Sequence, residues 1–384
     1  MRVAFVITKL FGGGTERRAL RTALGLSGLG EIEELLIACR QPQTEEIRAR
    51  LAGVKKVRLE EIPRRRRWDL GHLRELGRVL REFSPQVVHA WQVQDLYWAA
   101  AARPRRAGLV GSLFNSGLMD EAGRLPYPRS IYLNVGTAAR FAHLMLANCQ
   151  AGIDNWSRLA RIPRGKFRLL PNLVVFDPPP PLDDEERRQR REELGLSPDQ
   201  VVALSVARLH LPMKGQDMAL RAVAELAPRH PELVLLLAGD GPSREEVEEL
   251  HRRLGLGERV RLLGWVERPH ELLSLADLFL LASRTEGFPN ALVEAMVMGV
   301  PVVASAVGAV PEILRQGERG ILAEPTPEGI ARALEGMLGE LSRWREVARR
   351  QAEEVGREYS SESIIPRLLE LYREAAKIAG ASPL

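Results

Sequence analysis

The stretch EGFPNALVEAMVMGVPVVAS, residues 286–305, decides the fold expected of this chain. The apolar run Leu278–Ala282 before it predicts a strand, the glycine and proline of EGFP predict a turn, and Ala291–Met298 predicts a helix. The free N–H groups and positive dipole end at the start of that helix favour a diphosphate. Glu286 and Glu294 stand eight residues apart, close to two helical turns, so we expect both carboxylates on about the same face, bracketing a ligand rich in hydroxyl groups.

The same stretch resembles the donor site of the retaining glycosyltransferases of family 4, also called group 1. The similar features are the spacing of the two glutamates, the turn Gly287-Phe288-Pro289-Asn290 and the run GVPVVAS that follows. The resemblance implies an α/β fold of GT-B architecture, in which two Rossmann-like doubly wound domains face each other across a crevice. It also implies that Glu286 and the turn engage the transferred sugar, while Glu294 accepts hydrogen bonds from ribose hydroxyls.

Length and composition indicate a globular protein of two domains. The chain has 384 residues, of which 45% are hydrophobic and 27% charged. Met1–Leu10 lacks the pattern of a signal peptide, and no uncharged stretch is long enough, without glycine and proline, to span a membrane. Cys39 and Cys149 form neither a disulfide framework nor a zinc spacing. We therefore expect a cytoplasmic protein with peripheral contact to the inner face of the membrane.

Charge is divided unevenly along the chain. Residues 1–180 contain 29 Lys and Arg against 16 Asp and Glu, whereas residues 181–384 contain 26 against 34. A basic first half favours an anionic partner, and the tract Arg64–Arg67 could contact lipid headgroups or an acceptor phosphate. Arginine abundance from a GC-rich genome or heat adaptation, and ordinary solvated surface charge, are the alternatives.

Alternating strand-like and helix-like stretches predict two parallel sheets. The expected strands are Arg2–Thr8, Glu34–Ala38, Gln86–Ala90, Gly108–Leu113, His143–Ala147, Val201–Val206, Leu233–Ala238, Val260–Leu263, Leu278–Leu281 and Pro301–Ala304. The proline-rich residues 177–182 predict a linker. We expect an acceptor-binding domain over 1–176, the linker and a first helix over 177–198, a nucleotide-sugar-binding domain over 199–365, and a helix over 366–384 that crosses back to the first domain.

Two cations follow the strand expected at Val201–Val206. The segment VARLHLPMKG contains Arg208 and Lys214, and the family places there the cations that hold the nucleotide diphosphate. A departing diphosphate gains negative charge as the glycosidic bond breaks, so fixed cations stabilise the transition state selectively. Ordinary surface salt bridges are the alternative for both side chains.

Glycine-containing segments follow other expected strands. The family resemblance assigns the nucleotide base to Gly264-Trp265-Val266, where Trp265 could stack on the base but a packing aromatic is the favoured interpretation. The turn Gly239–Pro242 is expected to shape the crevice. In the first half, Gly12, Gly13 and Gly14 allow backbone to approach a phosphate at a helix start.

The first half departs from the family at one sugar contact. Family members often have a His where this chain has Asn115, and an amide cannot exchange a proton near neutral pH. His89 in VVHA matches the family and would face the donor sugar, although a buried structural His is an equal alternative.

The resemblance implies a retaining glycosyltransferase with a nucleotide sugar, most often a UDP-sugar, as donor and a glycan, lipid or other hydroxyl as acceptor. The chain has no Asp-x-Asp sequence, so we expect no metal and no further cofactor, with the leaving group met by Arg208 and Lys214 and with Glu286 as the third catalytic residue. The alternatives are a sugar-nucleotide epimerase of similar fold, an oxidoreductase, for which the glycine pattern is wrong, and a non-enzymatic binder of anionic polymers. No nucleic-acid recognition motif is present.

Overall fold

The computed structural model describes residues 1–11, 14–62, 70–114, 129–174, 176 and 178–380. These residues divide into two compact units. Unit 1 contains the described residues up to 174 together with residues 359–380, and unit 2 contains residue 176 and residues 178–358. No helix within the described residues is both long enough and apolar enough to cross a bilayer.

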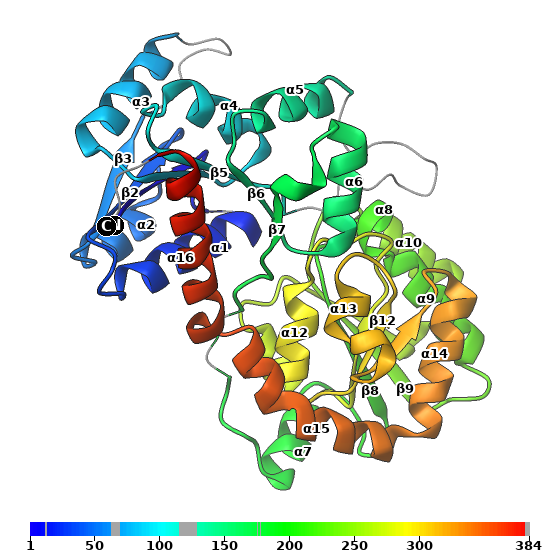
Figure 1. Ribbon diagram of the computed structural model, residues 1–384. Helices are drawn as coiled ribbons and strands as arrows, with labels where there is room; N and C mark the ends of the chain where they lie inside the picture. The colour runs from blue at the N-terminus through cyan, green and yellow to red at the C-terminus, as the bar shows by residue number, and fades with distance from the viewer. Residues whose placement is uncertain (12–13, 63–69, 115–128, 175, 177, 381–384) are drawn as a thin grey trace. The chain divides into compact units, whose positions relative to one another are not determined.

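The described part of unit 1 is built around a seven-stranded parallel sheet in the order β3-β2-β1-β4-β5-β6-β7 (Figure 1). Its strands are β1 Arg2–Ile7, β2 Glu34–Cys39, β3 Val57–Glu61, β4 Val87–Ala90, β5 Gly108–Ser112, β6 Leu144–Ala147 and β7 Phe167–Leu169. Its helices are α1 Gly14–Ser27, α2 Glu45–Ala52, α3 Leu70–Phe83, α4 Val93–Ala102, α5 Arg129–Ala139, α6 Gln150–Ala160 and α16 Ser361–Ile378, with a 3-10 turn, η1, at Arg164–Lys166.

The central strands of unit 1 are apolar on both faces because helices cover both sides of the sheet. Along β1, Val3 and Phe5 belong to the core that includes α1 and α16, whereas Ala4 and Val6 belong to the core that includes α3 to α6. All four side chains are 0% exposed. This two-sided burial is typical of a parallel sheet in an α/β protein.

The described part of unit 2 contains a six-stranded parallel sheet in the order β10-β9-β8-β11-β12-β13. Its strands are β8 Val201–Val206, β9 Leu233–Ala238, β10 Val260–Gly264, β11 Leu278–Leu281, β12 Val302–Ser305 and β13 Ile321–Ala323. Its helices are α7 Asp184–Glu193, α8 Leu211–Lys214, α9 Gln216–Leu226, α10 Arg244–Arg253, α11 Pro269–Leu273, α12 Asn290–Val297, α13 Val310–Ile313, α14 Pro327–Gly339 and α15 Leu341–Glu358, with 3-10 turns η2 Gly257–Arg259 and η3 Arg315–Gly317.

Both sheets begin in the middle and grow outward in two directions, which is the doubly wound order of Rossmann-like domains. The predicted fold class is therefore confirmed. In such sheets the crevice for ligands lies at the carboxyl ends of the strands, next to the central strands where the order reverses. In unit 2 those strands are β8 and β11, which carry the segments predicted to bind the donor.

The C-terminal helix differs from its predicted bounds. It begins at Ser361, not after Pro366, and the Ser360 hydroxyl caps it by accepting a hydrogen bond from the Ser363 N–H. Pro366 lies inside the helix, so the cap and not the proline sets the boundary. Unit 2 accordingly ends at Glu358 rather than at residue 365. The helix packs on β5 and α1 of unit 1 (Figure 1).

Candidate active site

Lys214 and Glu286, predicted to bind diphosphate and sugar respectively, form an ion pair. Lys214 Nζ lies 2.6 Å from Glu286 Oε1, and the Ser283 hydroxyl donates a second hydrogen bond of 2.6 Å to the same oxygen. The Glu286 side chain is only 7% exposed, whereas that of Lys214 is 24% exposed. An ammonium has three N–H groups, so within the described residues Lys214 keeps donors for a further anion.

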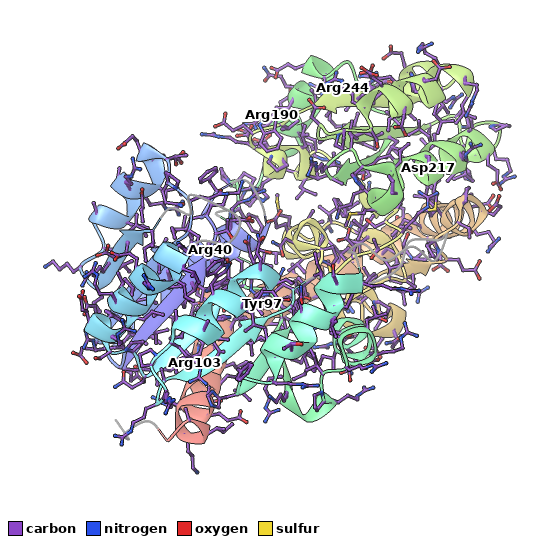
Figure 2. All side chains as sticks on the ribbon, turned by 90° about the horizontal axis from the view of Figure 1, so that it is seen from above. Arg40, Tyr97, Arg103, Arg190, Asp217 and Arg244 are labelled. Atoms are coloured by element: carbon purple, nitrogen blue, oxygen red, sulfur yellow. The ribbon has the colours of Figure 1, made fainter. Side chains whose placement is uncertain are left out.

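A second ion pair holds the segments of Lys214 and Glu286 together. Arg284 makes a bidentate contact with Asp217 on α9, at 2.7 and 2.8 Å, and also donates to the backbone oxygen of Leu211. Asp217 is labelled in Figure 2. The Met213 backbone oxygen accepts hydrogen bonds from the N–H groups of Arg284 and Thr285. These contacts fix the end of α8 against the loop that carries Glu286.

Arg208 lies directly after β8 on a loop that close backbone packing shapes. Its side chain is exposed and makes no ion pair with a carboxylate of the described residues. Next to it, a Cβ on Gly239 would stand 2.0 Å from the Ala207 oxygen, and one on Gly241 would stand 2.3 Å from the Leu209 oxygen. The glycines of the Gly239–Pro242 turn are therefore needed for the turn to lie against the Arg208 loop, and the guanidinium is left available to a ligand.

The loop of Glu286 has backbone packed tightly behind it. Gly308, with a positive φ of +57°, lies so close that a Cβ would stand 2.1 Å from the Glu286 carbonyl oxygen. The Ala309 N–H donates to the Gly287 oxygen at 2.9 Å. Phe288 and Pro289 are buried, and Asn290 begins α12. The turn Gly287–Asn290 thus sets where α12 starts, as the sequence predicts.

Glu294 lies on α12 with a different set of neighbours. His270 Nε2 on α11 is 3.2 Å from Glu294 Oε2, without the alignment of a hydrogen bond. The His270 ring stacks on Phe176, with ring centroids 4.2 Å apart. The prediction that both glutamates share one helical face is wrong, because α12 begins only at Asn290 and Glu286 belongs to the preceding loop.

The predicted base-binding segment lies at the end of an edge strand. Gly264 closes β10 with a positive φ of +68°, and its carbonyl accepts a hydrogen bond of 2.7 Å from the Gly239 N–H. Trp265 is 74% exposed, and Val266 is half-buried. The favoured interpretation of Trp265 as a packing aromatic is therefore wrong, because an edge strand has no neighbour on its outer side. Its ring is accessible for stacking.

The predicted contacts of unit 1 are only partly described. Gly12, Gly13, Asn115 and Arg64–Arg67 lie outside the described residues, and Gly14 is the first residue of α1. His89 is fully buried, and its ring nitrogens contact Tyr372 and Ser112. His89 is therefore a buried structural histidine, which was the alternative interpretation of the sequence. Its side chain does not contact a bound sugar directly.

Sequence reasoning missed Ser283, His270 and the Arg284–Asp217 pair. Ser283 is 0% exposed, and its position directly after a strand was the one signal that could have identified it. Arg284 and Asp217 are 67 residues apart, and His270 and Glu294 are 24 apart. No local pattern connects such pairs.

Comparison with known protein families gives two matches. The family model described as "Glycosyl transferases group 1" matches residues 200–340, and that described as "Glycosyltransferase Family 4" matches residues 12–177. The two matches cover most of both units. The chain therefore belongs to the group 1, or family 4, glycosyltransferases, as the sequence predicts.

The individual relatives have low sequence identity to this chain. The chain is 30% identical over 187 residues to N-acetyl-alpha-D-glucosaminyl L-malate synthase of Bacillus anthracis, an alignment that covers 48% of this chain and 49% of that protein. It is 27% identical over 347 residues to D-inositol 3-phosphate glycosyltransferase of Segniliparus rotundus, covering 85% of this chain and 75% of that protein. Against the first three curated relatives, the chain spans only half of their length or less.

Solved structures show the same fold. The structure of Anabaena HepE in complex with UDP has a TM-score of 0.79 and 21% identity, and the alignment covers 97% of this chain and 100% of that one. This likeness establishes the GT-B fold. The matches as a whole favour a transferase over the epimerase, the oxidoreductase and the binder of anionic polymers.

Proposed function

We propose that this protein is a retaining glycosyltransferase, which moves a sugar from a UDP-sugar to a hydroxyl group of a glycan or a lipid-linked acceptor without a metal ion. The observation that carries the proposal is the contact of Lys214 with Glu286 beside the start of α12. It joins a cation suited to a diphosphate with a carboxylate suited to sugar hydroxyls. The family membership supports the interpretation that the diphosphate and the sugar are parts of one donor molecule.

The charges of unit 2 match the demands of the reaction. When the bond from the sugar C1 to the phosphate oxygen breaks, negative charge grows on the diphosphate and positive charge on the sugar ring. The negative charge on the diphosphate is stabilised by Arg208, Lys214 and the N–H groups at the start of α12. Glu286, with one oxygen held by Lys214 and Ser283, keeps its other oxygen for a sugar hydroxyl.

We infer a front-face displacement, in which the acceptor oxygen bonds to C1 on the side from which the phosphate leaves. The acceptor proton passes to the departing phosphate oxygen, so that the anomeric configuration is retained. No protein nucleophile and no metal ion take part in this scheme. The cationic side chains supply the charge stabilisation that a metal would supply in other transferases.

The choice of donor and acceptor is supported by similar proteins. HepE has been solved with UDP and with UDP-glucose, and a lipopolysaccharide core glycosyltransferase of Rhizobium meliloti is among the relatives. A cell-envelope acceptor would suit the basic first half of the chain, whose charge favours an anionic membrane surface. We accordingly place the enzyme at the cytoplasmic face of a membrane.

A ligand screen tests the proposal directly. The melting temperature is measured with UDP, GDP, ADP, NAD and UDP-glucose, each with and without EDTA, since a ligand of the native state raises it by mass action. Stabilisation by UDP and UDP-glucose that is indifferent to EDTA supports the proposal. Stabilisation by NAD alone, or by no diphosphate, contradicts it, and dependence on a divalent ion contradicts the metal-free mechanism.

A further inference from the structure

Unit 1 contains a pocket of about 340 Å³ at the carboxyl ends of β4 and β5, beside the start of α1. Its lining includes Thr15, Trp91, Gln92, Gln94, Ser112 and Phe114. No charged side chain is among the described residues that line it. Trp91 is only 2% exposed and Phe114 is half-buried, with ring centroids 5.8 Å apart, so the apolar part of the lining comes mainly from Phe114. This combination suits a ligand that has C–H faces and uncharged hydroxyl groups.

Two of the lining residues have a buried polar atom without a hydrogen-bond partner. The indole N–H of Trp91 lacks an acceptor, and the side-chain oxygen of Gln92 lacks a donor. The Gln92 amide is held in this orientation because its nitrogen donates to Glu16 at 2.9 Å. Unsatisfied buried groups cost free energy. A hydroxyl group can both accept and donate, so a polyhydroxylated ligand is able to satisfy both atoms.

Ser112 connects the pocket to a buried chain of hydrogen bonds. Its Oγ lies 2.6 Å from His89 Nε2, and His89 Nδ1 lies 2.7 Å from the Tyr372 hydroxyl on α16. Burial lowers the pKa of His89 well below its usual value and raises the pKa of Tyr372 well above 10, so the imidazole and the phenol are both neutral.

The direction of the hydrogen bonds follows from the number of donors. Tyr372 is 0% exposed, and within the described residues its hydroxyl makes a hydrogen bond to His89 alone, so we assign its O–H as the donor to His89 Nδ1. A neutral imidazole then carries its proton on Nε2 and donates it to Ser112 Oγ. The O–H of Ser112 is left to point elsewhere, and the pocket is the space that Ser112 lines.

We propose that this pocket binds a neutral sugar or polyol unit of the acceptor, and that Ser112 donates a hydrogen bond to one of its hydroxyl oxygens. His89 and Tyr372 are positioning residues, which fix the direction of the Ser112 O–H. This inference rests on the proposed function for the existence of an acceptor, but not on the identity of the donor. It makes α16 part of the recognition of the acceptor.

The test uses saturation-transfer NMR on the full chain with simple probes. The neutral probes are methyl glycosides of glucose, galactose, mannose and N-acetylglucosamine, together with myo-inositol. Glucose 6-phosphate and glycerol 3-phosphate are the anionic comparison. At least one neutral probe is expected to bind the wild-type protein more strongly than either anionic probe. Binding of only the anionic probes, or of none, overturns the proposal.

Matched variants locate the binding. Ser112→Ala is expected to lower the affinity for the neutral probe at least fivefold. Ser112→Thr, which keeps the hydroxyl, is expected to retain most of that affinity. Gln94 lies at an exposed position of the lining, so Gln94→Ala is expected to lower the affinity for the neutral probe while the protein still folds. Ser157→Ala, which removes a hydroxyl of α6 that donates to the Ile162 carbonyl oxygen away from the pocket, is expected to have no effect. Equal binding by the Ser112→Ala and wild-type proteins overturns the role of Ser112.

Tyr372→Phe tests the positioning role. It is expected to change the ratio of affinities among the neutral probes, because the His89 proton is no longer directed to Nε2. Tyr97→Phe is the control, since the Tyr97 hydroxyl has no hydrogen-bond partner within the described residues. Tyr97 is labelled in Figure 2. A mere loss of stability would lower the melting temperature without changing the ratio, and an unchanged ratio contradicts the positioning role.

A UDP titration of the same samples separates this inference from the proposed function. If UDP binds and no neutral probe does, the pocket assignment is wrong and the donor site stands. If the neutral probe binds at the Ser112 pocket and UDP does not, the pocket is a site for neutral sugars and the proposed UDP-sugar donor is wrong.

Discussion

Glu286 shows how a buried carboxylate is kept in place by few contacts. One of its oxygens accepts from both Lys214 and Ser283, at 2.6 Å each, in a position where little solvent reaches it. Hydrogen bonds to an ionised group are shorter and stronger than neutral ones, and burial increases their weight. The side chain is therefore held in one orientation before a sugar binds.

We expect Lys214→Ala to lower the turnover of a UDP-sugar about 100-fold or more, because a fixed cation at the leaving diphosphate is lost. The measurement is the rate of UDP release, with the melting temperature as a check on folding. Lys377→Ala is the matched control, since Lys377 is an exposed lysine on α16. An unchanged rate in Lys214→Ala would show that Lys214 does not contact the diphosphate.

At this scale the sequence identifies single residues better than pairs. Arg208, Lys214, Glu286 and Glu294 could all be proposed because each lies in the loop or the helix that comes after a strand, and ligands bind at the ends of strands in parallel sheets. Their partners could not be predicted, because the pairs join positions far apart in the chain. His89 has the sequence surroundings of a site residue, but both faces of β4 are covered by core side chains and His89 is fully buried. Strand period alone does not say which face a ligand reaches.

Among the elements, the strands that sequence reasoning missed are β3, β7 and β13. Each of them lies at an edge of its sheet. An edge strand is less covered, so it can be short or polar, as in VRLEE of β3 and the three residues of β7 and of β13. The central strands are buried on both faces and have long apolar runs, and these were predicted within one or two residues.

A glycine near the site provides a test at the scale of the loop. Gly308→Ala would place a methyl group against the carbonyl oxygen of Glu286, in addition to the strain of a positive φ. Gly257→Ala has a similar φ of +51° and open space around the Cβ. We expect Gly257→Ala to lower the free energy of unfolding by about 1–2 kcal/mol and to leave the activity unchanged. Gly308→Ala is expected to lose more stability and most activity.

Urea unfolding and UDP release measure the two effects. If Gly308→Ala and Gly257→Ala lose the same stability and both keep activity, the packing of the Gly308 loop does not determine the position of Glu286. The comparison separates steric clash from backbone strain, which a single variant would not.

In unit 2 as a whole, Asp277 connects three elements. Its carboxylate contacts Arg187 and Arg191 of α7 and Arg345 of α15, at 2.9, 3.0 and 2.5 Å, and accepts from the Val202 N–H of β8. Burial raises the pKa of Asp277, but the Val202 N–H and the arginines outweigh it and hold the pKa below the ordinary value of 3.8. The ionised form is therefore favoured by folding.

We expect Asp277→Asn to lower the free energy of unfolding by about 3–5 kcal/mol, because buried arginine charge is left unpaired. A depressed pKa contributes stability above the unfolded-state pKa, and this contribution is lost as the pH falls through the folded-state value. The deficit of the variant should therefore shrink below pH 3.8. Urea unfolding at pH 7 and pH 3 measures it, and the exposed Asp240→Asn is the control. A deficit equal at both pH values would contradict the assignment.

Unit 1 is assembled from two separate parts of the chain. The seven residues Ile364, Ile365, Leu368, Leu369, Tyr372, Ala375 and Ala376 of α16 are buried in its core. Gly108 lies so close to α16 that a Cβ would meet the Ala375 backbone at 2.7 Å. We expect a protein truncated after Glu358 to lose the cooperative unfolding of unit 1 while that of unit 2 remains. Hydrogen exchange measures this, and retained protection of β1 and β5 would contradict it.

The return of α16 also sets an order of events during synthesis on the ribosome. The described part of unit 2 lies between residues 176 and 358, so all of its strands leave the exit tunnel before α16 has been translated. Unit 1 emerges earlier but has an incomplete core until the last helix arrives. Unit 2 can therefore reach its native state before unit 1, although it is translated later. Unit 1 keeps an apolar face accessible to chaperones until translation of α16 is complete.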